Sequence, residues 1–377
     1  MMRSIDYNYK GKNMDYELIL MLIGFSLAAY SIVANDAIQT LGTFLSSNAH
    51  RPWWVLWLFA MTVLAVTLLY GYYTHGGDVS YGRLEKFPPP AQFSWVYLLP
   101  PLFVLVLTRY SIPVSTTFLI LTVFVSTNLE KMLTKSLLGY LVAFVVAMVV
   151  YRLVVGVMEK YFIRTSDEEK PEKYWTALQW LSTGFLWSQW LTQDLANIFV
   201  YAPSMGMNEA GVRTISETWL YGALIWLGVL HAYLFYSRGG GIQKIVTSKT
   251  NTTDIRSATI VDIIYGIILF VFKGMSNIPM STTWVFLGLL AGREFAIAWL
   301  THLRSTKDVV KIVSSDAGKA TMGLAVSIAL AFSAPYLKNA FEPSAPKIAQ
   351  KELPQIPQSI STNDSTKKGE KYAIKFP

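Results

Sequence analysis

The sequence predicts an all-α integral membrane protein built as two inverted-topology repeats, each with three spanning helices and a re-entrant helical hairpin. Three observations predict this fold class. Hydrophobic residues make up 53% of the 377 positions and charged residues only 15%, whereas soluble domains have roughly 25% charged residues. Apolar runs long enough to cross a bilayer recur along most of the chain. Finally, two different polar motifs occur once in each half, in the same order.

Composition divides the chain into five parts. Residues 1–17 are a polar N-terminal segment, and residues 18–157 are the first membrane repeat. A charged linker at residues 158–174 precedes the second repeat, residues 175–337. Residues 338–377 are rich in Pro, Ser, Lys and Asn, which is typical of a disordered tail. The first apolar segment has no small-residue cleavage site, so we expect a helix and no separate signal peptide.

The first repeat begins with apolar segments at residues 18–45 and 53–73, which predict two spanning helices. The next apolar stretch, about residues 95–127, is broken at Pro113 into arms of 14 and 13 residues. Each arm can form roughly 20 Å of helix at ~1.5 Å per residue, which is less than the bilayer thickness. We therefore expect a re-entrant hairpin with its tip at residues 110–117, followed by a spanning helix at residues 136–157.

The second repeat follows the same plan. Residues 175–201 and 218–236 predict two spanning helices, and residues 318–337 predict the last one. Between them, about residues 258–300 predict a second hairpin with its tip at residues 273–283. The arms of this hairpin are longer, so two full crossings stay open as an alternative. Three crossings and one hairpin place the two ends of each half on opposite sides, which inverts the second half.

The basic residues favour a topology with both termini external. Twelve basic residues then fall in the inner loops and five in the outer loops, as the positive-inside rule requires. The outer five are Arg83, Lys86, Lys131, Lys135 and Arg213. We expect a multi-pass protein of a cell membrane, either a plasma membrane or a bacterial inner membrane. The net charge of +8 fits loops facing anionic lipid and not nucleic acid. A homodimer is left open.

One repeated motif is an aspartate inside an apolar helix. Asp36 and Asp194 lie 158 positions apart (194 − 36). Amide side chains flank both, namely Asn35 and Gln39 for the first and Gln193 and Asn197 for the second. A charge at bilayer depth costs at least ~2.5–3.5 kcal/mol, so something must offset it. A carboxylate with amide oxygens suits a small cation such as Na⁺, and a lone carboxylate can relay a proton. A hydrogen-bonded carboxylate at a helix kink is the alternative.

The other repeated motif is Pro-x-Ser-Thr-Thr, at residues 113–117 and 279–283, an offset of 166 (279 − 113). Because proline favours a helix start just after it, the Ser-Thr-Thr residues are expected in a first helical turn. Backbone N–H groups are unpaired there, and the helix dipole is positive, so a tetrahedral oxyanion is a suitable ligand. Two facing half-helix N-termini are typical of secondary transporters with broken helices. Ordinary N-capping is the alternative.

Other polar residues leave alternatives open. Arg109 and Lys273 precede the two tips, and either could attract an anion or compensate the dipole of the preceding half-helix. Asp262 is structural or an accessory ligand. His231 has no second histidine nearby, so we expect no metal site there. The chain has no cysteine, and no Ser-His triad is visible. We therefore expect a protein that is not an enzyme.

Several of these residues resemble the signatures of the inorganic phosphate transporter (PiT) family. Ala34-Asn35-Asp36 resembles the family's Gly-Ala-Asn-Asp, and residues 193–197, Gln-Asp-Leu-Ala-Asn, resemble its second copy, usually Asn-Asp-Val-Ala-Asn. The two Pro-x-Ser-Thr-Thr tips are also similar to that family's hairpins. The resemblance spans residues 18–337. This chain departs from the family at Val33, where the family has Gly, and at Gln39 and Gln193, where it has Asn.

The resemblance implies cation-coupled symport of inorganic phosphate, driven by Na⁺ or H⁺, with no other cofactor. It implies a coupling-cation site, with Na⁺ on the carboxylates, formed by Asp36, Asp194, Asn35 and Gln193. It implies a phosphate site formed by Ser115, Thr116, Thr117, Ser281, Thr282, Thr283, Gln39 and Asn197. Two alternatives stay open, namely a carrier of sulfate or another small oxyanion, and a non-transporting oxyanion-sensing receptor of the same fold.

Overall fold

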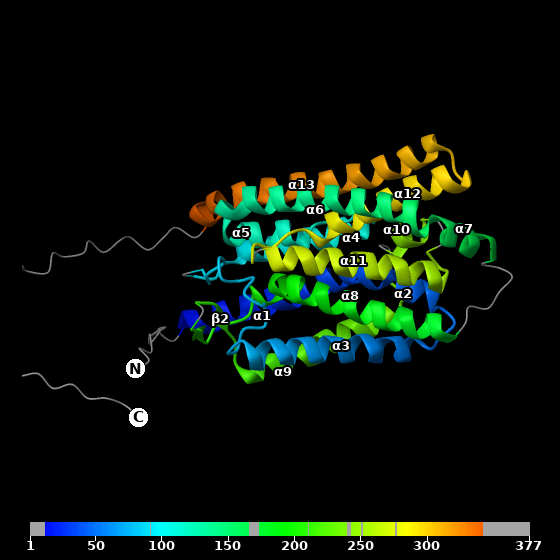
Figure 1. The fold of residues 1–377 in the computed structure, drawn as a ribbon. Helices are drawn as coiled ribbons and strands as arrows, with labels where there is room; N and C mark the ends of the chain where they lie inside the picture. The colour runs from blue at the N-terminus through cyan, green and yellow to red at the C-terminus, as the bar shows by residue number, and fades with distance from the viewer. Residues whose placement is uncertain are drawn as a thin grey trace, which may run out of the picture.

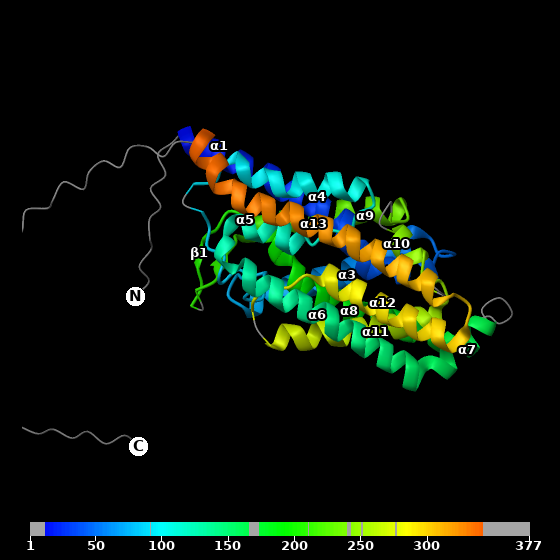
Figure 2. The same ribbon diagram turned by 90° about the horizontal axis from the view of Figure 1, so that it is seen from above.

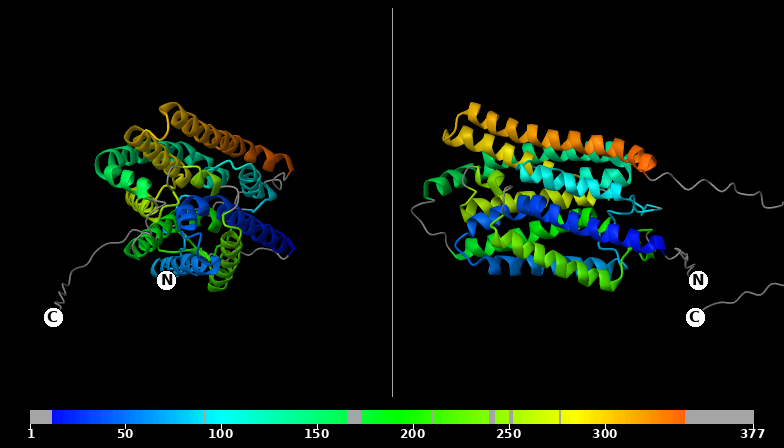
Figure 3. Two further views of the ribbon diagram at one scale, coloured as in Figure 1. Left: turned by 90° about the vertical axis from the view of Figure 1, so that its right-hand side faces the viewer. Right: turned by 180° about the vertical axis from the view of Figure 1, so that it is seen from behind.

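The computed structural model describes residues 12–90, 92–165, 173–209, 211–239, 243–249, 252–275 and 277–341. Its helices run along a common direction in one bundle (Figure 1). The predicted tail lies almost wholly outside the described residues, as do most of the N-terminal segment and residues 166–172 of the linker. The start of α1 (Lys12–Ile32) and the end of α13 (Thr306–Phe341) lie at the same end of the bundle (Figures 1 and 3).

The first predicted helix is one long rod with a local irregularity. α1 continues through a π-helical turn, η1 (Val33–Ala37), into α2 (Ile38–Ser47). π-Helical turns are rare in proteins, but those that occur are often found at functional sites. This one contains Asp36, the first embedded aspartate. After Pro52, α3 (Trp53–Thr74) returns along the bundle.

The first hairpin has short arms, as its sequence predicts. One arm is the 3₁₀ turn η2 (Trp95–Leu98) followed by α4 (Leu99–Arg109), and Pro100 and Pro101 occupy the first helical turn, where proline is tolerated. The other arm is a second π-helical turn, η3 (Thr117–Leu121), followed by α5 (Thr122–Phe124). α6 (Leu129–Val150) follows a 3₁₀ turn, η4 (Ser126–Asn128), and a third π-helical turn, η5 (Tyr151–Val155), joins it to α7 (Gly156–Thr165).

In the second half, α8 (Lys173–Phe199) and α9 (Glu217–Tyr236) are joined by a loop with a small antiparallel pair, β1 (Gly206–Met207) and β2 (Arg213–Thr214). The sequence did not predict this pair. After α10 (Gln243–Thr247), α11 (Ile255–Met275) and α12 (Thr282–Thr301) form the second hairpin. α13 is longer than its predicted 20 residues, because its start extends back through a charged stretch to Thr306.

The two hairpins approach the middle of the bundle from opposite ends. α4 begins and α5 ends near the end of the bundle where α1 starts, whereas α11 begins and α12 ends near the other end (Figures 1 and 2). Each hairpin packs against the last long helix of the other half. α12 lies along α6, and η3 and α5 lie along α13 (Figure 2).

Seven helical stretches of the described residues are long and apolar enough to cross a membrane. They are Tyr16–Ser47, Trp53–Thr74, Ser126–Leu153, Glu217–Tyr236, Ile255–Met275, Thr282–Thr301 and Thr306–Ala340. Both arms of the second hairpin are among them, so the alternative of two full crossings there fits their length. α8 is long enough, with 27 residues, but it has many polar side chains, and several of them are buried, among them Gln179, Thr183 and Gln193. The helix packs against α11, α3 and α2.

Small residues allow the closest helix contacts. A Cβ atom added to Gly288 or Gly292 of α12 would lie 2.3 or 2.1 Å from the backbone carbonyl oxygens of Tyr140 and Phe144 in α6. The two backbones therefore touch over this stretch, as in the small-residue interfaces of membrane helices. This contact fixes the position of the second hairpin against α6.

Candidate functional site

The residues that the sequence predicts for the site come together in the bundle interior. Each of them is at most 4% exposed. They come from η1 and α2, from the tip of the first hairpin, from the end of α8 and from the start of α12. They are Asn35, Asp36, Gln39, Ser115, Thr116, Thr117, Gln193, Asp194, Asn197, Ser281, Thr282 and Thr283.

Asp36 is bonded from its own helix and from the first hairpin. Its Oδ1 accepts hydrogen bonds from Asn35 Nδ2 at 2.5 Å and from Gln39 Nε2 at 3.5 Å. Its Oδ2 accepts a hydrogen bond from the hydroxyl of Thr116. Thr283 of the second hairpin also lies beside this carboxylate. Both hairpins therefore reach Asp36.

Asp194 has a corresponding set of neighbours. Its Oδ1 accepts hydrogen bonds from Asn197 Nδ2 at 2.8 Å and from Thr117 Oγ1 at 3.2 Å. Thr282 of the second hairpin lies beside it. Asn197 Nδ2 also donates to the hydroxyls of Thr116 and Thr117, at 3.2 and 3.1 Å. The two carboxylates are thus joined through adjacent threonines of one hairpin tip.

The two hairpin tips touch each other directly. The carbonyl oxygen of Val114, in the first tip, accepts a hydrogen bond from Thr283 Oγ1 of the second tip at 3.0 Å. The same oxygen accepts from Asn35 Nδ2 at 2.7 Å. Thr282 is fixed in turn, because its carbonyl oxygen accepts a hydrogen bond from Tyr265 Oη at 3.0 Å. Segments that are far apart in the chain therefore converge on one small polar volume.

The serines of both tips are helix caps. Ser115 Oγ accepts a hydrogen bond from the backbone N–H of Phe118 at 3.3 Å, and Ser281 Oγ accepts one from Trp284 at 3.2 Å. Capping, the alternative considered from the sequence, therefore applies to these two hydroxyls. Each serine still has its own O–H to donate, because capping uses only a lone pair.

Four side-chain oxygens of the site are buried without a hydrogen-bond partner among the described residues. They are Gln39 Oε1, Gln193 Oε1, Asp194 Oδ2 and Asn197 Oδ1. Buried polar atoms are nearly always paired, so these acceptors have the capacity to bind a further partner. A set made only of oxygens is typical of a hard cation. Gln193 faces α11, since its Nε2 donates to the carbonyl of Leu269 at 3.0 Å.

Two residues near the site were missed by sequence reasoning. Tyr265 is 1% exposed and lies within electrostatic range of both carboxylates. Arg83, in the loop after α3, is also 1% exposed, and its charge acts on Asp194. Burial lowers the pKa of Arg83 to about 10, so the guanidinium stays charged at neutral pH. Neither residue belongs to a motif that the sequence repeats, so no pattern indicated it.

Three other residues considered from the sequence, Asp262, Arg109 and His231, are not part of this group of site residues. Asp262 is fully buried, and its two oxygens accept from Thr43 Oγ1 at 2.7 Å and Thr183 Oγ1 at 2.5 Å. Both of its oxygens thus have a hydroxyl donor, which fits a structural role. Arg109 is exposed in the last turn of α4. His231 bonds a carbonyl of its own helix, and the described residues include no group of three His, Cys, Asp or Glu that could hold a metal ion.

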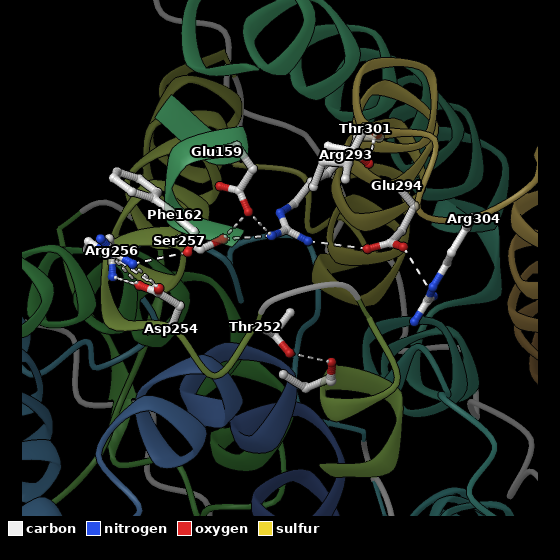
Figure 4. Close-up of polar contacts among 12 residues, drawn as sticks. Glu159, Phe162, Thr252, Asp254, Arg256, Ser257, Arg293, Glu294, Thr301 and Arg304 are labelled. Carbon is white, nitrogen blue, oxygen red and sulfur yellow. Dashed lines mark hydrogen bonds and ion pairs between the residues drawn. The ribbon is translucent and has the colours of Figure 1, made fainter. Parts of the chain in front are cut away.

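A second polar cluster lies towards the end of the bundle opposite the start of α1, where α7, α11 and α12 meet (Figures 1 and 4). Arg293, which is fully buried, pairs with Glu159 at 3.0 Å and with Glu294 at 3.2 Å. Ser257 accepts from Arg293 at 2.6 Å and donates to Glu159 at 2.8 Å. Arg304, which follows α12, forms a further ion pair with Glu294 at 3.3 Å. These contacts tie the second hairpin to the end of the first half.

Comparison with known proteins gives one informative likeness. No family model matches the chain, and no curated protein matches it. A solved structure described as "The sodium-dependent phosphate transporter" aligns with a TM-score of 0.51 and 17% sequence identity, over 86% of this chain and all of that one. At this identity the likeness shows a shared fold. Together with the apolar helices, it makes this chain a mostly helical, multi-pass membrane protein, with a distant structural relationship to a phosphate transporter.

Proposed function

We propose that the chain is a secondary active symporter that moves inorganic phosphate across a cell membrane, coupled to Na⁺ or H⁺. The observation that supports this most strongly is the meeting of two Ser-Thr-Thr turns, from hairpins that approach from opposite ends, beside two buried carboxylates. Helix N-termini suit an oxyanion and buried carboxylates suit a cation. The likeness to a phosphate transporter favours phosphate as the oxyanion.

The coupling cation would bind the oxygens around Asp36 and Asp194. Asp194 Oδ2, Asn197 Oδ1 and Gln39 Oε1 are buried acceptors that a Na⁺ ion would satisfy. A proton would satisfy only one acceptor at a time, so the number of unpartnered oxygens favours Na⁺. Asn35 would act by fixing Asp36 to the first tip, since its Nδ2 bonds both the carboxylate and the Val114 carbonyl.

The threonine hydroxyls supply a reason for coupling. Thr116 and Thr117 donate to the carboxylates of Asp36 and Asp194, and a hydroxyl has one proton to donate. The carboxylates therefore compete with phosphate for these donors. At an effective dielectric constant of about 20, a carboxylate and an anion roughly 5 Å apart also repel by about 3 kcal/mol per unit charge. A cation on the carboxylates would cancel this repulsion and free the hydroxyls for phosphate.

The contacts also support the inverted-repeat proposal. Asp36 has Thr116 and Thr283 as neighbours, and Asp194 has Thr282 and Thr117. Exchanging each residue for its counterpart in the other half leaves this pattern unchanged. Such an exchange suits alternating access around a fixed central site, as in transporters built from inverted repeats.

Uptake into proteoliposomes tests the proposal. Purified protein should accumulate labelled phosphate when an inward Na⁺ or H⁺ gradient is imposed, and not with K⁺ on both sides. Excess sulfate should compete weakly if phosphate is the substrate, and strongly if the chain is a general oxyanion carrier. Phosphate binding without accumulation under either gradient would reject transport and favour the receptor alternative.

A further inference from the structure

Three basic side chains meet at the tip of the second hairpin. Arg83 Nη1 donates to the carbonyl oxygen of Ile278 at 3.0 Å, and Lys135 Nζ of α6 donates to the same oxygen at 2.8 Å. Lys273 lies near the end of α11, and its Nζ is 4.9 Å from the centre of the Tyr81 ring. Tyr81 is in the same loop as Arg83, two positions before it. We call Arg83, Lys135 and Lys273 the basic cluster.

The basic cluster is a concentration of like charge. Both lysines lie close enough to Arg83 for their charges to repel it. Such repulsion, combined with the burial of Arg83, favours a negative ion beside the cluster in addition to the nearby carboxylate of Asp194. Of the acidic residues in the same loop, Asp78 accepts hydrogen bonds within the loop, from Ser80 and Gly82. Glu85 is exposed and accepts from Asn277 at 3.4 Å.

The basic cluster is also continuous with the central site. Ile278 directly precedes Pro279 of the second tip, so two members of the cluster bond the backbone just before the Ser-Thr-Thr turn. The field of Asp194 reaches Arg83. Gly82 packs on the same tip, because a Cβ there would lie 3.0 Å from Asn277 Nδ2. A negative ion held by the cluster would therefore lie next to the tip and not at a remote surface.

We propose that Arg83, Lys135 and Lys273 form a second, peripheral binding site for the transported oxyanion, occupied before the anion reaches the two Ser-Thr-Thr turns. The inference rests on the proposed transport function, which it extends to a second site. An anion here would compete with the Ile278 carbonyl for the donors of Arg83 and Lys135. Its binding would loosen the tip of the second hairpin from the loop and helix that hold it. A cation on Asp194 would strengthen the site, because it would remove the carboxylate field from Arg83.

Kinetics of phosphate uptake test the peripheral site with matched variants. Lys135→Gln and Lys273→Gln should each raise the KM for phosphate roughly tenfold, the lower end of what one charge-assisted hydrogen bond supplies. Lys131→Gln is the control, because this substitution removes the same charge one turn earlier on α6, from a side chain that is exposed. Equal KM values for all three variants and the wild type would overturn the peripheral site and leave the transport proposal intact. A wild type that takes up no phosphate would overturn transport itself.

A second measurement needs no variant. Wild-type protein in proteoliposomes is treated with a lysine-acetylating ester, and modified peptides are quantified by mass spectrometry. Inorganic phosphate at constant Na⁺ and ionic strength, balanced with chloride, should slow acetylation of Lys135 and Lys273 several-fold and leave Lys131 unchanged. Equal rates at Lys135 and Lys273 with and without phosphate would contradict the peripheral site.

Discussion

The buried ion cluster around Arg293 gives a prediction whose size follows from the structure (Figure 4). Arg293→Met keeps most of the side-chain volume but removes the guanidinium shared by Glu159 and Glu294. All three side chains are at most 1% exposed, so two carboxylates would lose a charged partner away from water. Removing one partner of a buried ion pair costs about 3–5 kcal/mol. We therefore expect a large loss of stability.

Thermal unfolding in detergent micelles measures this loss, and Arg304→Met is the control. Arg304 pairs with Glu294 at 3.3 Å but is about a third exposed, so its removal should cost about 1 kcal/mol or less. Adding Glu159→Gln to Arg293→Met should recover part of the stability, because it removes the buried negative charge that Arg293 compensates in the wild type. A midpoint for Arg293→Met equal to that of Arg304→Met would show that the buried cluster does not hold the second hairpin.

Two further predictions concern the second hairpin. Gly292→Ala should lower the unfolding midpoint, because the added Cβ would lie 2.1 Å from the Phe144 carbonyl oxygen. Gly222→Ala is the control and should not lower it, because no atom lies within 4 Å of a Cβ there. Equal midpoints would refute the close contact of α12 with α6. Tyr265→Phe removes one hydrogen bond to the Thr282 carbonyl, worth about 0.5–1.5 kcal/mol, and should therefore raise the KM for phosphate about 2- to 10-fold. An unchanged KM in proteoliposomes would show that this hydrogen bond does not position the tip.

Features that depend on local sequence were predictable. Long apolar runs predicted the membrane class, which is confirmed, because a bilayer demands about 20 apolar residues for each crossing. Pro113 and Pro279 predicted the helix starts at the two tips, since proline fixes the backbone and lacks an N–H. The inverted relation of the halves and the roles of the site residues stay predictions.

Features that depend on distant parts of the chain were not predictable. Arg83 was assigned to an outer loop, yet it is buried because that loop folds onto the Ile278 carbonyl, 195 positions away. The partners of Asp262, Thr43 and Thr183, come from two other helices. The π-helical turn at Asp36 also has no local signature in Val33–Ala37. Such contacts follow from the packing of helices, which one sequence read alone does not specify.

The central claim is that a cation on the buried carboxylates prepares the threonine turns for phosphate. The most direct test is phosphate uptake by Asp36→Asn and Asp194→Asn proteoliposomes at increasing external Na⁺, with the insertion of each variant verified. The account predicts that uptake no longer responds to Na⁺ in either variant and falls to the background of empty liposomes. Uptake with the wild-type Na⁺ dependence in both variants would contradict it.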